Sequence, residues 1–236
     1  MPQISSKPFV SLYSIICATL ISACASTGLE SFQVRNLAKS DSGKVYELIV
    51  ASQIESVNSL MVKLYRRNPR ELAKAVPGTT IDSRLLQVFG NDGPHWFHDE
   101  LLGKASIEAL ELAFSEHFDG DRVLAFTVGL GSMIMESYNN KTEFFILDHI
   151  NPQKIYDSAR NIEITHWRLN NKQLPDGGLM LISNSYSPTE LNTSFDRLIN
   201  RIIDYQGLVV DMLGGGSGRL VETGVRRLAT AMFIPL

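Results

Sequence analysis

The sequence predicts an all-α protein, a single multi-helix domain of about eight helices. Two observations support this fold class. Apolar residues recur at steps of three and four over most of the chain after residue 40, and Asn-Pro or Ser-Pro pairs stand where helices would begin. The best strand candidate is Leu179 to Ile182, and one short run cannot form a sheet.

The first helix is expected from about residue 44 to residue 67, because one face of it is apolar: Val50, Ile54, Val57, Met61 and Leu64. A second helix is expected to follow directly, with Asn68 as its cap, Pro69 at its first position and Glu71 completing a capping box. Thr80 to Phe89 is a short helix candidate, and Pro94 to His117 is a longer one.

A buried central helix is expected from Val123 to Tyr138, capped by Asp119 or Asp121. The thirteen residues from Val123 to Met135 carry no charge, yet a bilayer-spanning helix needs about 20. Gly129 and Gly131 would let neighbouring helices approach closely.

The second half of the chain continues the helical pattern. Glu143 to His149 is a helix candidate, and a longer helix is expected from 151 to 170 with Asn151 as its cap. Ser187, Pro188 and Glu190 predict a further capping box, followed by an apolar stripe from Leu191 to Ile203. Gly214 is expected to end that helix.

The N-terminal segment has the pattern of a secretory signal. One cation, Lys7, precedes fifteen mostly apolar and uncharged residues from Phe9 to Ala23. A signal-peptide core needs about 7–15 apolar residues, so this segment fits a removable signal better than a permanent membrane helix.

The end of that segment, Ile21-Ser22-Ala23-Cys24, resembles the lipobox of bacterial lipoproteins. The resemblance implies that residues 1–23 are removed and that Cys24 carries the lipid. Residues 24–40 would then be a lipidated tether, and residues 41–236 the helical domain. Ala25 after the cysteine implies an outer-membrane protein facing the periplasm, anchored to the membrane through its lipid. Alternatives are a signal peptide cut elsewhere or a retained N-terminal helix.

The cysteine count agrees with this address. The chain has two cysteines, Cys17 and Cys24. If Cys17 is removed and Cys24 is acylated, the mature protein has neither a free thiol nor a disulfide, which suits an oxidising envelope.

The mature chain is mildly acidic. Removing Lys7 changes the formal net charge from −3 to −4. This charge offers no general attraction to nucleic acid, and we expect no nucleic-acid partner.

The glycine-rich stretch from Met212 to Leu220 matches no phosphate-binding motif. A P-loop needs Lys and then Ser or Thr after its last glycine, but Arg219 and Leu220 follow Gly218. We interpret the stretch as a helix end and a turn, and we expect no cofactor.

His95 and His98 stand three residues apart beside Asp99 and Glu100. Two imidazoles and a carboxylate suit zinc with an open position. Their spacing matches no zinc-enzyme motif such as His-Glu-x-x-His, so packing beside aromatic residues is the favoured interpretation and no metal is expected.

Residues 63 to 74 hold five cations, Lys63, Arg66, Arg67, Arg70 and Lys74, against one acid, Glu71, and the first four are the candidate binding residues. Such a run is usually a solvated face that complements a helix end. The functional alternative is a surface for anionic lipid headgroups or an acidic partner.

The mature chain also resembles a group of uncharacterised proteobacterial lipoproteins in three stretches: MVKLYRRNPRELAK, FDGDRVLAFTVGLGSMI and SARNIEITHWRLNN. This resemblance implies the envelope address and no activity.

The leading hypothesis is a lipid-anchored helical envelope protein that acts by binding an envelope protein partner, as a scaffold, adaptor or assembly factor. One alternative is an envelope hydrolase or metal-dependent enzyme built on His95, His98 and nearby carboxylates. Another is a receptor for a small apolar ligand that uses the Met- and Phe-rich region from Phe114 to Phe145.

Overall fold

The centre of the fold is a buried helix, as the uncharged segment predicted. The computed structural model describes residues 41–187, 189–214 and 232–236. The lipobox, Cys24, the tether and Gly215 to Leu220 of the glycine-rich stretch lie outside these residues.

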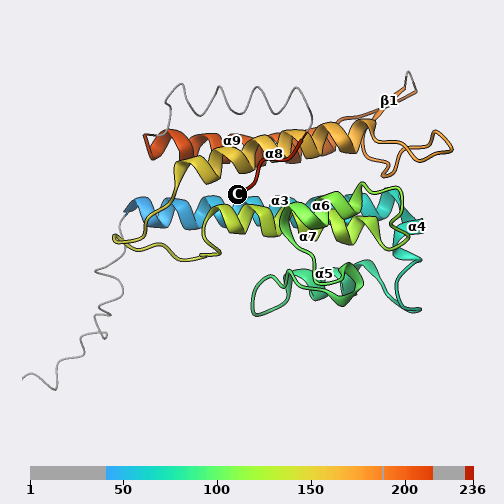
Figure 1. The fold of residues 1–236 in the computed structure, drawn as a ribbon, viewed down its shortest axis with the longest axis horizontal. Helices are drawn as coiled ribbons and strands as arrows, with labels where there is room; N and C mark the ends of the chain where they lie inside the picture. The colour runs from blue at the N-terminus through green and yellow to red at the C-terminus, as the bar shows by residue number, and fades with distance from the viewer. Residues whose placement is uncertain (1–40, 188, 215–231) are drawn as a thin grey trace, which may run out of the picture. The chain divides into compact units, whose positions relative to one another are not determined.

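The described residues confirm an all-α fold class, with seven α-helices, one short 3-10 helix and a two-stranded hairpin. The elements in chain order are α3 (Asp41–Arg67), α4 (Pro69–Leu72), α5 (Ile81–Phe89), η1 (Asp99–Leu101), α6 (Ser106–Ala113), α7 (Arg122–Ser137), α8 (Pro152–Asn171), β1 (Ser185–Ser187), β2 (Glu190–Asn192) and α9 (Ser194–Met212). The long helices α3, α7, α8 and α9 lie alongside one another (Figure 1). Within the described residues no helix is both long and apolar enough to cross a membrane.

Helix α7 packs against α3, α6 and α8, and every residue of it except Glu136 is buried. Asp121 caps it, because its side chain accepts hydrogen bonds from the backbone of Val123 and Leu124. The expected close approach of helices is confirmed at Gly129. A Cβ there would lie 2.7 Å from the backbone nitrogen of Leu110 in α6.

The expected helix from 94 to 117 is wrong. The chain forms η1 and α6 instead, and three residues between or at the start of them have positive φ: Leu102 (57°), Gly103 (69°) and Ser106 (51°). A left-handed residue ends a right-handed helix. The segment before η1 also brings Trp96 against Gly131, where a Cβ would lie 2.3 Å from the indole ring.

The expected capping box after residue 67 is also wrong. Asn68 makes no cap bond; its side chain instead pairs with the backbone of Ile182, accepting from N at 2.7 Å and donating to O at 2.8 Å. Glu71 is buried and accepts a hydrogen bond from the backbone N of Arg122 at 2.9 Å. The side chains of Asn68 and Glu71 therefore form hydrogen bonds with backbone groups that are distant in the sequence, because buried backbone groups need hydrogen-bond partners.

Residues 185–192 form an antiparallel hairpin, with Tyr186 opposite Leu191. The expected capping box at Ser187 is therefore wrong, and Leu179 to Ile182, the best strand candidate in the sequence, do not form a strand. Leu179 makes only an isolated bridge to Gln173. Helix α9 begins at Ser194, where Asn192 accepts a hydrogen bond from the Ser194 backbone.

The segment from 143 to 149 is not helical either, because its polar groups close turns instead. Asp148 accepts a hydrogen bond from the backbone of Phe145 and pairs with Lys141. Two other boundaries are confirmed. Asn151 caps α8 through the backbone N of Gln153, and Gly214 follows α9 with φ of 70°.

Candidate functional site

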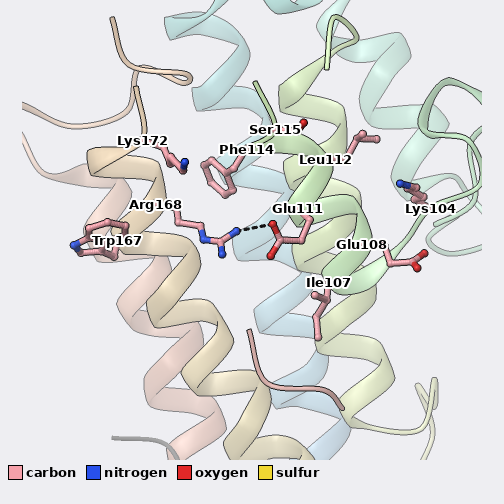
Figure 2. A pocket seen from close by; sticks show the side chains of 10 residues that line it. All are labelled: Lys104, Ile107, Glu108, Glu111, Leu112, Phe114, Ser115, Trp167, Arg168 and Lys172. Carbon is pink, nitrogen blue, oxygen red and sulfur yellow. Dashed lines mark hydrogen bonds and ion pairs between the residues drawn. The ribbon is translucent and has the colours of Figure 1, made fainter. Parts of the chain in front are cut away.

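An open groove lies between α6 and α8, which both pack on α7. Its volume is about 720 Å³. Figure 2 shows its lining: Lys104, Ile107, Glu108, Glu111, Leu112, Phe114, Ser115, Trp167, Arg168 and Lys172. The size falls in the range of ligand-binding clefts.

An ion pair crosses this groove. Arg168 of α8 donates to Glu111 of α6 at 3.0 Å, and Figure 2 shows the two side chains pointing toward one another. The Arg168 side chain is only 13% exposed, whereas that of Glu111 is 54% exposed. The guanidinium also stacks on Phe233, 4.2 Å from the ring centroid. Arg168 is therefore held from two sides, which fixes its position in the groove.

The groove is amphipathic, with a small excess of positive charge. The lining includes three cations, Lys104, Arg168 and Lys172, and two carboxylates, Glu108 and Glu111, and the Phe114 ring is almost fully buried. Lys172 points from the end of α8 into the open part (Figure 2). Arg and aromatic side chains dominate binding energy at protein interfaces. The arrangement can hold a segment that is partly apolar and partly acidic.

Three of the four cations predicted as a basic patch contact the hairpin region. Lys63 donates to Ser194 Oγ at 2.5 Å and lies over the Phe195 ring, and Arg67 donates to Ser185 Oγ at 2.5 Å. Arg70 donates to the carbonyls of Leu179 and Met180, both at 3.0 Å. Arg66 is exposed. Hydrogen bonds from this cluster thus connect the end of α3 and helix α4 to residues 179, 180, 185 and 194.

His95 and His98 do not converge on a shared position. Nε2 of His98 bonds the carbonyl of His95 at 2.9 Å, and its Nδ1 lies 3.4 Å from Gln87 Nε2. Burial lowers the pKa of His98, which favours its neutral form. No group of three or more His, Cys, Asp or Glu side chains in the described part of the chain could hold a metal ion.

The structure brings together a buried charged network that periodicity did not predict. Arg84 is 2% exposed and makes two 2.6 Å hydrogen bonds to the carboxylate of Glu100. It also lies 3.5 Å from Oδ2 of Asp121, and the same oxygen accepts a hydrogen bond from the Tyr65 hydroxyl at 2.7 Å. Burial raises the pKa of Asp121, although the bond from Tyr65 opposes this. The only sequence clue was an arginine, Arg84, on the buried side of α5 beside Val88.

A second polar cluster joins α8, α9 and the hairpin. Asp196 accepts hydrogen bonds from Asn184 at 2.6 Å and Tyr186 at 2.7 Å, and it lies 2.5 Å from His166 Nε2. Partial burial alone would raise the pKa of Asp196, but the bonds from Tyr186 and His166 lower it below its usual range. Both carboxylate oxygens of Asp196 face internal donors, so we interpret this cluster as a support for the hairpin.

A smaller cleft of about 410 Å³ lies beside α3 and is lined partly by Val50, Ile54, Phe89 and Met135. It bears on the apolar-ligand hypothesis. From the region Phe114 to Phe145, however, only Met135 and Thr142 line it, while Phe114 lines the α6–α8 groove. The region therefore does not form one shared pocket among the described clefts.

The described residues define an all-α protein with an amphipathic groove between two helices. No family model, curated protein or solved structure matches the chain.

Proposed function

We propose that this protein is a lipid-anchored envelope protein that faces the periplasm and acts by binding a protein partner in the groove between α6 and α8. The observation that carries the proposal is the groove itself. It is open, it is large enough for several side chains, and it sets cations around an aromatic floor. The lipobox at residues 21–24 supports the anchor.

The lining favours a protein segment over an apolar small molecule. A ligand without charge would leave Lys104 and Lys172 unpaired at the contact, and burying an unpaired charge is costly. A segment with acidic and apolar side chains would satisfy both the cations and the floor. The basic cluster at Lys63, Arg66, Arg67 and Arg70 remains a weaker candidate, because three of its members already bind the hairpin region.

Replacing Lys172 with a photo-cross-linking amino acid is expected to capture one discrete partner in intact cells. Lys172 points into the open groove, so a bound segment would lie within its reach. The matched control places the same amino acid at Lys44, an exposed lysine of α3. Adducts are read by immunoblotting and mass spectrometry. The same adducts at both positions, or none at position 172, would contradict the proposed site.

Cys24→Ser is expected to move the protein from the membrane fraction to the soluble fraction and to abolish labelling with a palmitate analogue. An acyl chain contributes about 0.8 kcal/mol per buried methylene, so stable anchoring depends on the lipids that this thiol would receive. Cys17→Ser is the control and should keep both properties. If Cys24→Ser fractionates like the wild type, the anchor is wrong.

A further inference from the structure

Residues 232–236 lie against α8 as an extended segment, dark red in Figure 1. One side chain, Asn161, pairs with both backbone groups of Ile234. Its Nδ2 donates to the Ile234 carbonyl at 2.7 Å, and its Oδ1 accepts from the Ile234 nitrogen at 2.6 Å. Asn161 is fully buried. The side-chain amide of Asn161 thus makes the same pair of backbone hydrogen bonds with Ile234 that a neighbouring β-strand would make.

Three side chains of the segment are packed against the protein: Phe233, Ile234 and Leu236. Ile234 is only 4% exposed, and Phe233 stacks under Arg168. Pro235 follows Ile234 and biases it toward an extended backbone, which suits the double bond to Asn161. The neighbouring Met232 and Pro235 are exposed. The segment is therefore held by two aliphatic side chains, of which Ile234 is the more buried, by one aromatic side chain, and by one pair of backbone hydrogen bonds.

The seat of this segment continues into the open groove. Asn161, Arg168 and Lys172 are seven and four residues apart, so they share one face of α8. Phe233 is at Arg168 and Ile234 is at Asn161, so the chain direction from 234 back to 233 runs toward Lys172. Residues that precede the aromatic position of a bound peptide would therefore enter the open part.

We propose that the site on α8 which residues 232–236 occupy, together with the open groove beside it, binds an extended segment of a partner protein, and that the partner displaces residues 232–236 from Asn161 and Arg168. The inference rests on the proposed function and specifies its ligand. The partner segment has an aromatic residue followed by an aliphatic one, with acidic residues before them.

Each part of this ligand has a binding partner on α8 or in the groove. The aliphatic residue takes the buried position of Ile234, and Asn161 forms hydrogen bonds with its backbone N–H and carbonyl groups. The aromatic residue stacks on Arg168. The acidic residues reach Lys172, since successive residues of an extended chain advance about 3.3 Å and the chain runs from Arg168 toward it.

A partner segment has to compete with residues 232–236 for the same site, and this competition sets the affinity that it needs. In the sequence, nineteen residues, 213–231, lie between the end of α9 and residues 232–236. A segment on the same chain competes with a free peptide as an intramolecular ligand, at its own effective concentration. A free peptide should therefore bind weakly to the wild-type protein and at least about tenfold more tightly once residues 232–236 are released.

The test uses two fluorescent peptides, Glu-Glu-Glu-Ala-Met-Phe-Ile-Pro-Leu and its counterpart with three lysines, titrated into the purified protein by fluorescence anisotropy. Ile234→Asp is expected to release residues 232–236 from α8, because a carboxylate at this buried position would lose its hydration. We expect this variant to bind the acidic peptide at least about tenfold more tightly than the wild type does. Adding Asn161→Leu should remove the gain, and adding Lys172→Glu should remove the preference for the acidic peptide. Lys44→Glu is the matched control and should leave both unchanged.

Equal binding by the wild type and Ile234→Asp, or no effect of Asn161→Leu, would overturn the proposal. If Ile234→Asp does not fold, hydrogen exchange of the wild type decides the question. An exchangeable segment predicts that the Ile234 amide exchanges much faster than amides of α7 such as Leu130. Equal protection at both sites would make residues 232–236 a permanent part of the core.

The two proposals can fail separately. A partner captured at Lys172 together with a failed peptide test would retain the groove as the site and reject the displaced segment. Peptide binding without a captured partner would retain the recognition chemistry and reject the envelope partner.

Discussion

Arg84→Met is expected to lower the free energy of unfolding by about 3–5 kcal/mol at neutral pH. Arg84 is 2% exposed and pairs with Glu100 and Asp121. Methionine fills a similar volume but leaves the Asp121 carboxylate, 4% exposed, without its cation. Removing one partner from a buried ion pair is costly because the other charge stays buried.

Urea denaturation followed by circular dichroism measures this loss. Lys44→Met is the control, because it breaks an exposed pair with Asp41 and such pairs contribute about 0–1 kcal/mol. A loss for Arg84→Met no larger than that of the control would show that the network does not stabilise the fold.

The pH dependence of this loss follows from the two carboxylates. Hydrogen bonds from Arg84 lower the pKa of Glu100, so this group stabilises the fold above its ordinary pKa, about 4.3, and the contribution is lost as pH falls through the lowered folded-state value. Burial raises the pKa of Asp121, so its ionisation costs stability at higher pH. Both effects make the deficit of Arg84→Met largest near pH 7. The part due to Asp121 should shrink as pH falls through its raised pKa, and the part due to Glu100 only below about 4.3.

The sequence predicted the long helices because their signals are local. The stripe in α3, the uncharged run of α7 and the Asn151 cap each lie within a few turns of chain. The errors arose where distant groups decide local structure. Asn68 binds Ile182 rather than its own helix, and left-handed residues at Leu102 and Ser106 break the segment from 94 to 117.

The groove could not be predicted for the same reason. Arg168 and Lys172 looked like surface charges of an amphipathic helix, and no pattern connects Asn161 with Ile234, 73 residues further on. Glu111 and Arg168 meet only because α6 and α8 both pack on α7. Close packing at Gly129 was predictable as a possibility, but its neighbour, α6, was not.

Gly129→Ala is expected to lower the free energy of unfolding by about 1–3 kcal/mol, the usual cost of overpacking a core. The new methyl group would lie 2.7 Å from the Leu110 nitrogen and 2.9 Å from the Ser106 carbonyl oxygen. Both are backbone atoms, so α6 itself would have to move. The gain in helix propensity, about 1 kcal/mol, should not offset this.

Gly207→Ala is the matched control within α9. Nothing lies within 4 Å of the position of its Cβ, and the residue is exposed, so alanine should stabilise the helix by about 0.5–1 kcal/mol. Both variants are measured by urea denaturation. Equal effects of the two substitutions would contradict the tight contact between α6 and α7.

Because Gly129 sets how closely α6 lies on α7, it also sets the position of Glu111 opposite Arg168. Gly129→Ala should therefore weaken peptide binding in the groove in the Ile234→Asp protein, whereas Gly207→Ala should leave it unchanged.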